Sequence, residues 1–327
     1  MSEGIGLIKL KLWNKNMKEM KTMKIFETLI YCSVLSLSLA SCADSESDIT
    51  PEAPEKNYFA VDDNATDEES ILRRQFYKDN GCYLLYNDTL RNDSIGKKAN
   101  GEVIYKTETV DLPYVMSSLS SFAYKYTYIK DIDKKKSAVA FIEKYILPHL
   151  STKLRPYSWL LVNSITKYAI QDNKYTYDSE QESVLGNRAT AIAIGTVFDM
   201  DEDDVKQFAK ELSASILAKK VSIQADNITA SFTKFSNSLY DTYATVMPND
   251  DDSNMALMQE KGFICPNDSW GFTLYGQFPT KAEDEEAFAK LVVEKDEQEV
   301  RDMYNNETII QKYLAMRQII LNLGYIF

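Results

Sequence analysis

The stretch Thr190–Ala218, TAIAIGTVFDMDEDDVKQFAKELSASILA, sets the fold class because it places a buried strand directly before an amphipathic helix. Its first five residues form a short apolar run that ends at Gly195, which is typical of a strand buried on both faces. From Val205 onward, apolar residues recur every three or four positions, and this spacing predicts a helix over Val205–Ala218. Asp203 and Asp204 stand just before it, where an N-cap carboxylate is expected.

On either side of this stretch, strands are predicted mainly before it and helices mainly after it. Upstream, we expect a helix from Asp67 to the turn at Asp79–Gly81, a strand at Cys82–Tyr86, a helix at Lys134–Ile146 and a buried strand at Trp159–Val162. Downstream, we expect helices at Asn227–Tyr243, Thr280–Glu294 and Glu307–Leu323. Because strands and helices do not alternate regularly, the order predicts an α+β fold with a small mixed sheet and C-terminal helices.

The N-terminal region is typical of a secretory signal. Lys18, Lys21 and Lys24 precede the apolar run Thr28–Ala40, whose 13 residues fall short of the roughly 20 that a membrane-spanning helix needs. The run ends in Leu-Ala-Ser-Cys, which resembles the lipobox of bacterial lipoproteins and predicts that Cys42 is lipidated. We therefore expect four segments: residues 1–22 as an over-extended start and n-region, 23–41 as the signal peptide, 42–65 as a flexible acidic tether, and 66–327 as one domain.

The charge of the chain limits its partners. With 37 basic and 49 acidic residues the net charge is −12, and the chain after Cys42 keeps 31 basic and 46 acidic residues and a net charge of −15. This negative field disfavours nucleic acids and anionic lipids, so no nucleic-acid partner is expected and membrane attachment depends on acyl chains, at about 0.8 kcal/mol per buried methylene. The acidic segment Ala43–Asp48 is similar to the signal that sends lipoproteins of the Bacteroidetes to the outer face of the outer membrane. We expect an outer-membrane lipoprotein exposed at the cell surface, with the periplasm as the alternative.

Two of the four cysteines remain available for pairing. Cys32 leaves with the signal and Cys42 is acylated, so Cys82 and Cys265 are the candidates for a disulfide in an oxidising compartment. A reactive thiol is the alternative interpretation.

The scarcity of histidine narrows the chemistry more than any motif does. His149 is the only histidine, so one chain cannot build a zinc site from two or three imidazoles, and we interpret His149 as structural. No serine-hydrolase elbow, phosphate-binding loop or dinucleotide-binding loop occurs. The alternating carboxylates of Asp199–Asp204 fit helix capping better than a calcium loop, which needs a glycine at its turn. We therefore predict neither a metal nor a cofactor.

Several short matches nevertheless resemble a known family. They include Ile146–Leu150 followed by Trp159–Val162, Gly186–Arg188, the helix Phe208–Lys219, Gly262–Ile264 and Glu285–Ala289. Together with the lipobox, they are similar to the zinc-binding metallopeptidase lipoproteins of the Bacteroidetes, also described as substrate-import-associated zinc metallohydrolases. The resemblance implies a zincin-like fold and a link to TonB-dependent importers.

The resemblance also shows what this chain lacks. In active members the helix matching Val205–Ala218 carries H-E-x-x-H, whose histidines bind zinc and whose glutamate polarises water. Here Glu211 and Ser215 stand at the histidine positions, Leu212 stands at the glutamate position, and Lys290 stands where the family places a further acidic ligand. An alternative register puts Lys210, Glu211 and Ala214 at these positions. Both registers lose both imidazoles.

The resemblance therefore implies a domain that kept the scaffold and lost the metal. We expect a non-catalytic binding or accessory component of a TonB-dependent nutrient-uptake system, with the importer and its surface lipoprotein as partners and a glycan or a peptide as ligand. The first alternative is a hydrolase that uses carboxylates in the same cleft. The second is a purely structural surface lipoprotein.

Overall fold

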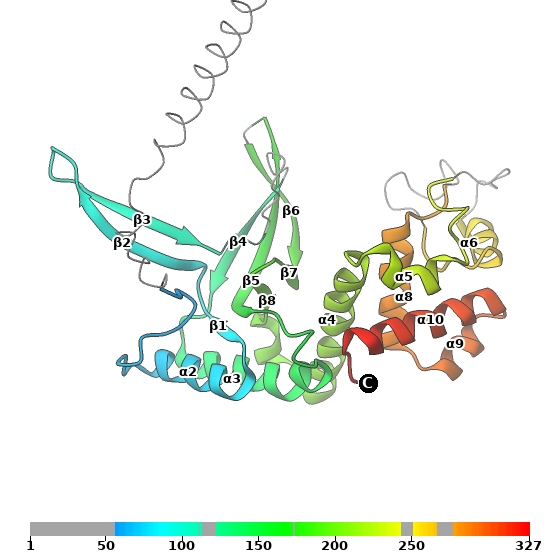
Figure 1. Ribbon diagram of the computed structural model, residues 1–327, viewed down its shortest axis with the longest axis horizontal. Helices are drawn as coiled ribbons and strands as arrows, with labels where there is room; N and C mark the ends of the chain where they lie inside the picture. Colours follow the sequence, from blue (N-terminus) through cyan, green and yellow to red (C-terminus); the bar gives the residue numbers. More distant parts are fainter. Residues whose placement is uncertain (1–55, 111, 113–121, 173, 243–250, 267–276) are drawn as a thin grey trace, which may run out of the picture. The chain divides into compact units, whose positions relative to one another are not determined.

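The computed structural model describes residues 56–327 except 111, 113–121, 173, 243–250 and 267–276, and Asn57–Phe327 form one compact unit. The first half contains α2 (Glu68–Asn80), β1 (Tyr83–Leu85), β2 (Thr89–Lys97), β3 (Val103–Thr109), β4 (Phe122–Tyr128), α3 (Ile132–Phe141), β5 (Ser158–Gln171), β6 (Lys174–Gln181), β7 (Ser183–Leu185) and β8 (Thr190–Ala193). The second half contains α4 (Glu202–Ser222), α5 (Asp226–Thr233), α6 (Asp251–Glu260), α8 (Lys281–Glu294), α9 (Glu297–Met303) and α10 (Glu307–Leu323) (Figure 1). The predicted α+β class, with a small mixed sheet and C-terminal helices, is confirmed.

Within the part of the chain that the structure describes, the main sheet has six strands built around β5. The first half of β5 pairs in parallel with β1 on one edge and with β8 on the other, and its second half pairs antiparallel with β4 and β6. The short strand β7 pairs antiparallel with β8 and lies at the end of the strand order. The sheet is therefore mixed because one long strand serves two sets of partners.

Alternate residues of β5 face two separate cores. Trp159 and Leu161 pack with residues of α2, α3 and α4, while Leu160 and Val162 pack on the opposite face with Phe59. This alternation is the period of two that a strand imposes on its side chains. The sequence run Trp159–Val162 is continuously apolar because both faces of the strand are covered.

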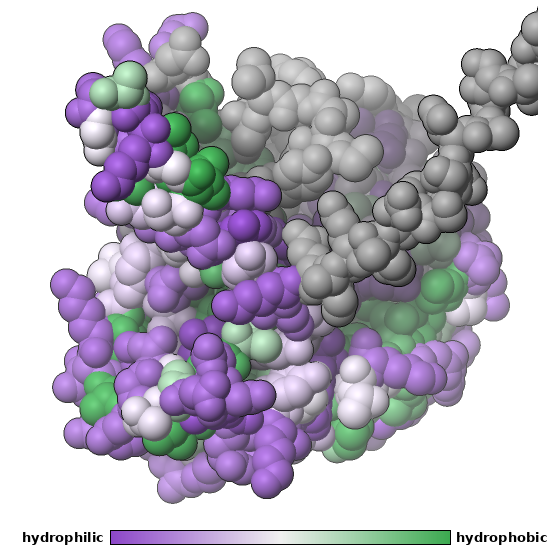
Figure 2. Space-filling view, turned by 60° about the vertical axis from the view of Figure 1, so that its left-hand side comes forward, coloured by the Kyte–Doolittle hydropathy of each residue, from purple (hydrophilic) through white to green (hydrophobic). Residues whose placement is uncertain are grey.

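A two-stranded ribbon, β2 paired antiparallel with β3, lies outside the main sheet. Most of its residues are exposed, including the apolar side chains of Ile95 and Tyr105. Figure 2, which turns this side of Figure 1 toward the viewer, shows a mostly hydrophilic surface with scattered hydrophobic residues. Single exposed apolar side chains of this kind are normal on protein surfaces.

The join between β8 and α4 requires a glycine and a capping carboxylate. A Cβ at Gly195 would collide with the carbonyl oxygen of Asn163 on β5, so only glycine lets the chain turn this close to the sheet. The cap of α4 is Asp201, whose carboxylate accepts hydrogen bonds from the backbone N–H groups of Asp203 and Asp204. Our prediction that Asp203 and Asp204 cap the helix was wrong. Both residues lie in the first turn of α4, and their backbone N–H groups donate to the cap residue Asp201.

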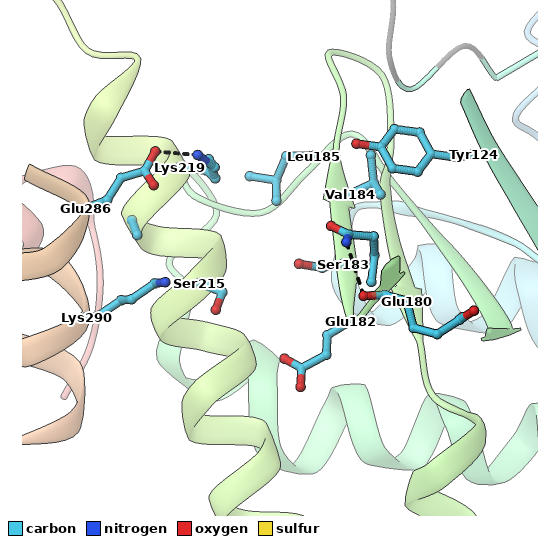
Figure 3. Close-up of a pocket in the computed structure, with 12 residues that line it drawn as sticks. Tyr124, Glu180, Glu182, Ser183, Val184, Leu185, Ser215, Lys219, Glu286 and Lys290 are labelled. Carbon is cyan, nitrogen blue, oxygen red and sulfur yellow. Dashed lines mark hydrogen bonds and ion pairs between the residues drawn. The ribbon is translucent and has the colours of Figure 1, made fainter. Parts of the chain in front are cut away.

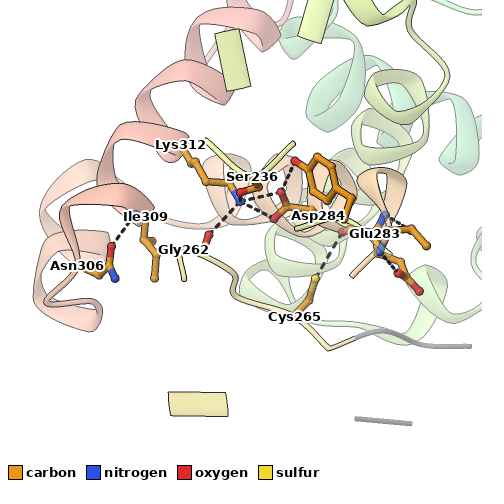
Figure 4. A network of polar contacts seen from close by, with 10 residues as sticks. Ser236, Gly262, Cys265, Glu283, Asp284, Asn306, Ile309 and Lys312 are labelled. Carbon is orange, nitrogen blue, oxygen red and sulfur yellow. Dashed lines mark hydrogen bonds and ion pairs between the residues drawn. The ribbon is translucent and has the colours of Figure 1, made fainter. Parts of the chain in front are cut away.

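The C-terminal helices enclose a buried ion pair (Figure 4). The Lys312 ammonium on α10 lies 2.7 and 2.8 Å from the two carboxylate oxygens of Asp284 on α8, and both side chains are fully buried. It also donates to Ser236 Oγ at 3.0 Å and to the carbonyl oxygen of Gly262 at 2.9 Å, while Tyr240 donates to Asp284 at 2.8 Å. Burial raises the pKa of Asp284 and lowers that of Lys312, and their contact with each other opposes both shifts.

The compact unit begins nine residues before the Thr66 at which we expected the domain to start. The amide of Asn57 donates to the hydroxyls of Tyr83 and Tyr157, and Phe59 is buried in the second core. The proposed signal and Cys42 lie outside the described residues. Among the helices that the structure describes, none combines the length and the apolar character that crossing a membrane requires.

Candidate functional site

A cleft of about 500 Å³ lies between the two halves of the compact unit (Figure 3). Its first wall consists of α4 and α8, and its second wall consists of β4, the end of β6, and β7. The residues that line it are Tyr124, Glu180, Gln181, Glu182, Ser183, Val184, Leu185, Ser215, Ala218, Lys219, Glu286 and Lys290. The volume falls within the range of about 300–1,000 Å³ that is usual for ligand pockets.

No described strand pairs with the side of β7 that faces away from β8, so β7 presents an open backbone edge along this cleft. Val184 pairs with Ala191 of β8, and on either side the carbonyl of Glu182 accepts from Ala193 and the amide of Gly186 donates to Ala189. Alternate residues of an antiparallel strand direct their backbone groups to opposite sides. The N–H and C=O groups of Ser183 and Leu185 therefore point away from β8, and both residues line the cleft.

Basic and acidic side chains face each other on the helical wall. Lys219 on α4 forms an ion pair with Glu286 on α8, and the Ser222 hydroxyl also donates to Glu286 at 3.0 Å. Lys290 lies one turn after Glu286 and lines the same cleft. The wall thus offers ammonium and carboxylate groups within one short surface.

Glu182 is the acidic residue of the strand wall whose pKa is shifted by its surroundings. Its side chain reaches solvent, yet the cleft walls partly desolvate the carboxylate and raise its pKa. The nearby carboxylate of Glu211 raises the pKa of Glu182 further, and Lys290 acts in the opposite direction. The charges of Glu211 and Lys290 therefore both act on the carboxylate of Glu182.

The structure brings together three of the four residues that we inferred from the degenerate motif. Ser215 and Lys290 line the cleft, and Glu211 lies one helical turn before Ser215 on the same side of α4 and acts on Glu182. Leu212 is fully buried in the main core, so it has no part in the cleft.

The residues at these positions do not fit a zinc ion. Of the carboxylate, hydroxyl and ammonium at these positions, only the carboxylate of Glu211 is a usual zinc ligand, and the ammonium of Lys290 repels a cation. Across the part of the chain that the structure describes, no group of three or more His, Cys, Asp or Glu side chains is arranged to hold a metal ion. His149 lies elsewhere, where its Nδ1 is 2.8 Å from the carbonyl oxygen of Ile326.

The expected disulfide is not formed in the structure. Cys82 is a thiol in the main core, where burial raises its pKa, and the Cys265 thiol lies 3.6 Å from the carbonyl oxygen of Glu283. The two cysteines lie in different parts of the fold, at the start of β1 and before α8. We predicted the disulfide from the number of cysteines and from the oxidising compartment alone. Neither of these determines whether the two side chains lie close together in the fold.

Sequence reasoning missed Glu182, Lys219 and Glu286. Lys219 follows Glu211 and Ser215 at the same four-residue spacing, so extending that spacing by one turn finds it. No sequence signal identified Glu182, because β6 and β7 were not predicted and the edge strand is only three residues long.

Comparison of the chain with protein-family models, with curated proteins and with solved structures finds no match. The family resemblance inferred from the short motifs therefore stays a prediction, and the site has to be interpreted from its own geometry.

Proposed function

We propose that this protein is a lipid-anchored binding protein whose cleft takes a peptide in an extended conformation without cleaving it. We also propose that the scaffold is zincin-like and that the protein is an accessory component of a TonB-dependent importer. The zincin-like assignment is supported by the edge strand β7, the strand β8 and the helix α4, which follow one another along the chain beside the cleft. The link to an importer is supported by the sequence motifs quoted above.

The open edge of β7 is the observation that carries the peptide proposal. An extended chain can add to a free strand edge through backbone hydrogen bonds, which are independent of sequence, while neighbouring side chains select the residues. Ser183 and Leu185 supply this edge, and each backbone hydrogen bond contributes about 0.5–1.5 kcal/mol. A peptide of mixed charge is the favoured ligand because the walls carry both Lys290 and Glu182.

The absence of catalysis is inferred from the side chains that line the cleft. Among the described residues they offer carboxylates, ammonium groups, hydroxyls, one amide and one phenol, and they include neither an imidazole nor a thiol. A Ser215 nucleophile would need a base within hydrogen-bond reach, and the structure gives Ser215 no such contact among the described residues.

The test selects peptides from a random display library on purified full-length protein and measures the affinity of the best synthetic peptide by calorimetry. Ser183→Pro removes one outward N–H but leaves the bonds to β8 intact, since proline is tolerated at a free edge. We expect Ser183→Pro to weaken binding by about tenfold or more and the matched control Ser183→Ala to bind like the wild type. Failure to select any peptide, or equal binding by Ser183→Pro with an unchanged circular dichroism spectrum, contradicts the proposal.

A carboxylate-based hydrolase is the second candidate, favoured by the raised pKa of Glu182 beside Glu211. A raised pKa suits a general acid, and a second carboxylate nearby suits a base or a nucleophile. Incubation with peptide and glycan panels separates the two candidates. Turnover that Glu182→Gln and Glu211→Gln abolish, while Glu180→Gln retains it, supports the hydrolase and defeats the binding proposal.

A further inference from the structure

A second pocket of about 320 Å³ lies on another side of α4 and is lined in part by the C-terminal residues Tyr325 and Phe327. Lys206, Ala209, Lys210 and Ser213 line it, whereas the cleft takes residues 215, 218 and 219 of the same helix. At 100° per residue these two sets lie on different faces of α4. The two pockets are therefore separate sites that share one helix.

Aromatic side chains form the walls of this second pocket. Tyr145 lies on one side, and Tyr325 and Phe327 pack edge to face with a 5.1 Å distance between ring centroids. Arg317 covers the Phe327 ring at 4.5 Å and helps to fix it in place. Burial raises the pKa of Tyr325 to about 12, so this wall stays uncharged at neutral pH.

One polar group in the wall has no partner. Ser213 is 3% exposed, and its hydroxyl makes no hydrogen bond within the described structure. An unsatisfied buried hydroxyl costs about 1–3 kcal/mol, so a hydrogen-bonding atom in the pocket would recover part of this free energy. Ser213 thus marks a place for a polar ligand atom.

The remaining polar groups favour an anion. Lys206 is paired with Glu202 at 3.5 Å and Asp203 at 3.3 Å, but Lys210 makes no ion pair with any described residue. His149 uses Nδ1 toward a carbonyl oxygen, which can only accept, so Nδ1 carries the proton. Of the two described lysines that line this pocket, Lys210 is therefore the one whose ammonium has no ion-pair partner.

We propose that this pocket binds a small organic anion with a ring, whose carboxylate contacts Lys210 and Ser213 and whose ring lies against Tyr145 and Tyr325. The walls supply flat apolar surfaces, and the polar groups lie together on one helix. This arrangement fits the usual pattern of a pocket, in which a few polar groups orient a mainly apolar ligand. The site is independent of peptide binding in the cleft.

The test titrates the full-length protein with phenylacetate and, as isosteric control, the neutral phenylacetamide, followed by calorimetry and ligand-observed NMR. We expect saturable binding of phenylacetate and at least about tenfold weaker binding of the amide. Lys210→Gln and Ser213→Ala should each weaken phenylacetate binding about threefold to tenfold, while Lys234→Gln, at an exposed lysine just after α5, should leave it unchanged.

Ser213→Ala also separates ligand binding from a structural role. Because the hydroxyl has no partner, its removal should leave the melting temperature unchanged or slightly higher while affinity falls. The proposal is overturned if phenylacetate, benzoate and cyclohexanecarboxylate all fail to bind at up to about 10 mM. It is also overturned if binding is the same in Lys210→Gln and Ser213→Ala as in the wild type.

Discussion

Two lysine–carboxylate pairs join neighbouring helices to α8, and one is buried whereas the other is exposed to solvent. Lys312 and Asp284 are each 0% exposed, whereas Lys219 and Glu286 are 59% and 23% exposed and line the cleft. Asp284 and Glu286 are only two residues apart, so they lie on different faces of one helix. The comparison shows how the same contact serves as a core element on one face of α8 and as a ligand-accessible group on the other.

The buried pair should dominate stability. Lys312→Met leaves the Asp284 carboxylate buried without its cation, and we expect a loss of about 3–5 kcal/mol in the free energy of unfolding, measured by urea titration. The double variant Lys312→Met/Asp284→Leu should recover most of this loss, because three phenylalanine rings surround Lys312 and accept an apolar chain. A single-variant loss below about 1 kcal/mol would show that the pair is not a core element.

The exposed ion pair of Lys219 and Glu286 should contribute little to stability. Lys219→Met is expected to change the free energy of unfolding by about 0–1 kcal/mol, as for exposed ion pairs, and to change the affinity of the selected peptide. Lys234→Met, just after α5, is the matched control, for which both the free energy of unfolding and the peptide affinity should stay at the wild-type value. A destabilisation as large as that of Lys312→Met would remove the distinction between the two faces of α8.

Glu182 should give the smallest effect, and its sign depends on pH. The pKa of Glu182 in the folded protein is raised above the ordinary 4.5 of the unfolded chain, so the folded state holds this proton more tightly. The free energy of unfolding therefore falls as the pH rises from the unfolded-state pKa to the folded-state pKa. Glu182→Gln should therefore be more stable than the wild type at pH 7, and the two should converge below about pH 4. Melting temperatures measured between pH 3.5 and 8 test this, with Glu180→Gln as control, and a wild type more stable at neutral pH would reverse the assignment.

Much of the fold followed from local patterns in the sequence. The helix Glu307–Leu323 ends as predicted because Gly324 has a positive φ of 106° that suits a helix C-cap. The helix expected at Asn227–Tyr243 is regular only over Asp226–Thr233, although its apolar spacing continues. Residues 234–241 form turns instead, and Ser236 serves the buried ion pair.

The strands of the cleft and the ribbon could not be predicted. β6 and β2 are rich in polar residues because they are solvent-exposed, so they lack the apolar alternation that marks a half-buried strand. Of the candidate site, Glu211, Ser215 and Lys290 were predicted from the family resemblance, and the spacing along α4 explains why Glu211 and Ser215 lie on one side of the helix. The opposite wall, with Glu182 and the β7 edge, depends on pairing with β8, which is a tertiary contact.

Amide hydrogen exchange at β7, measured by NMR with and without the selected peptide, tests the central claim most directly. The outward N–H groups of Ser183 and Leu185 should exchange fast in the free protein and become protected in the complex, while Val184, already paired with β8, should be protected in both. Binding of the peptide with no change in protection at Ser183 and Leu185 would contradict the claim that the ligand adds to this edge.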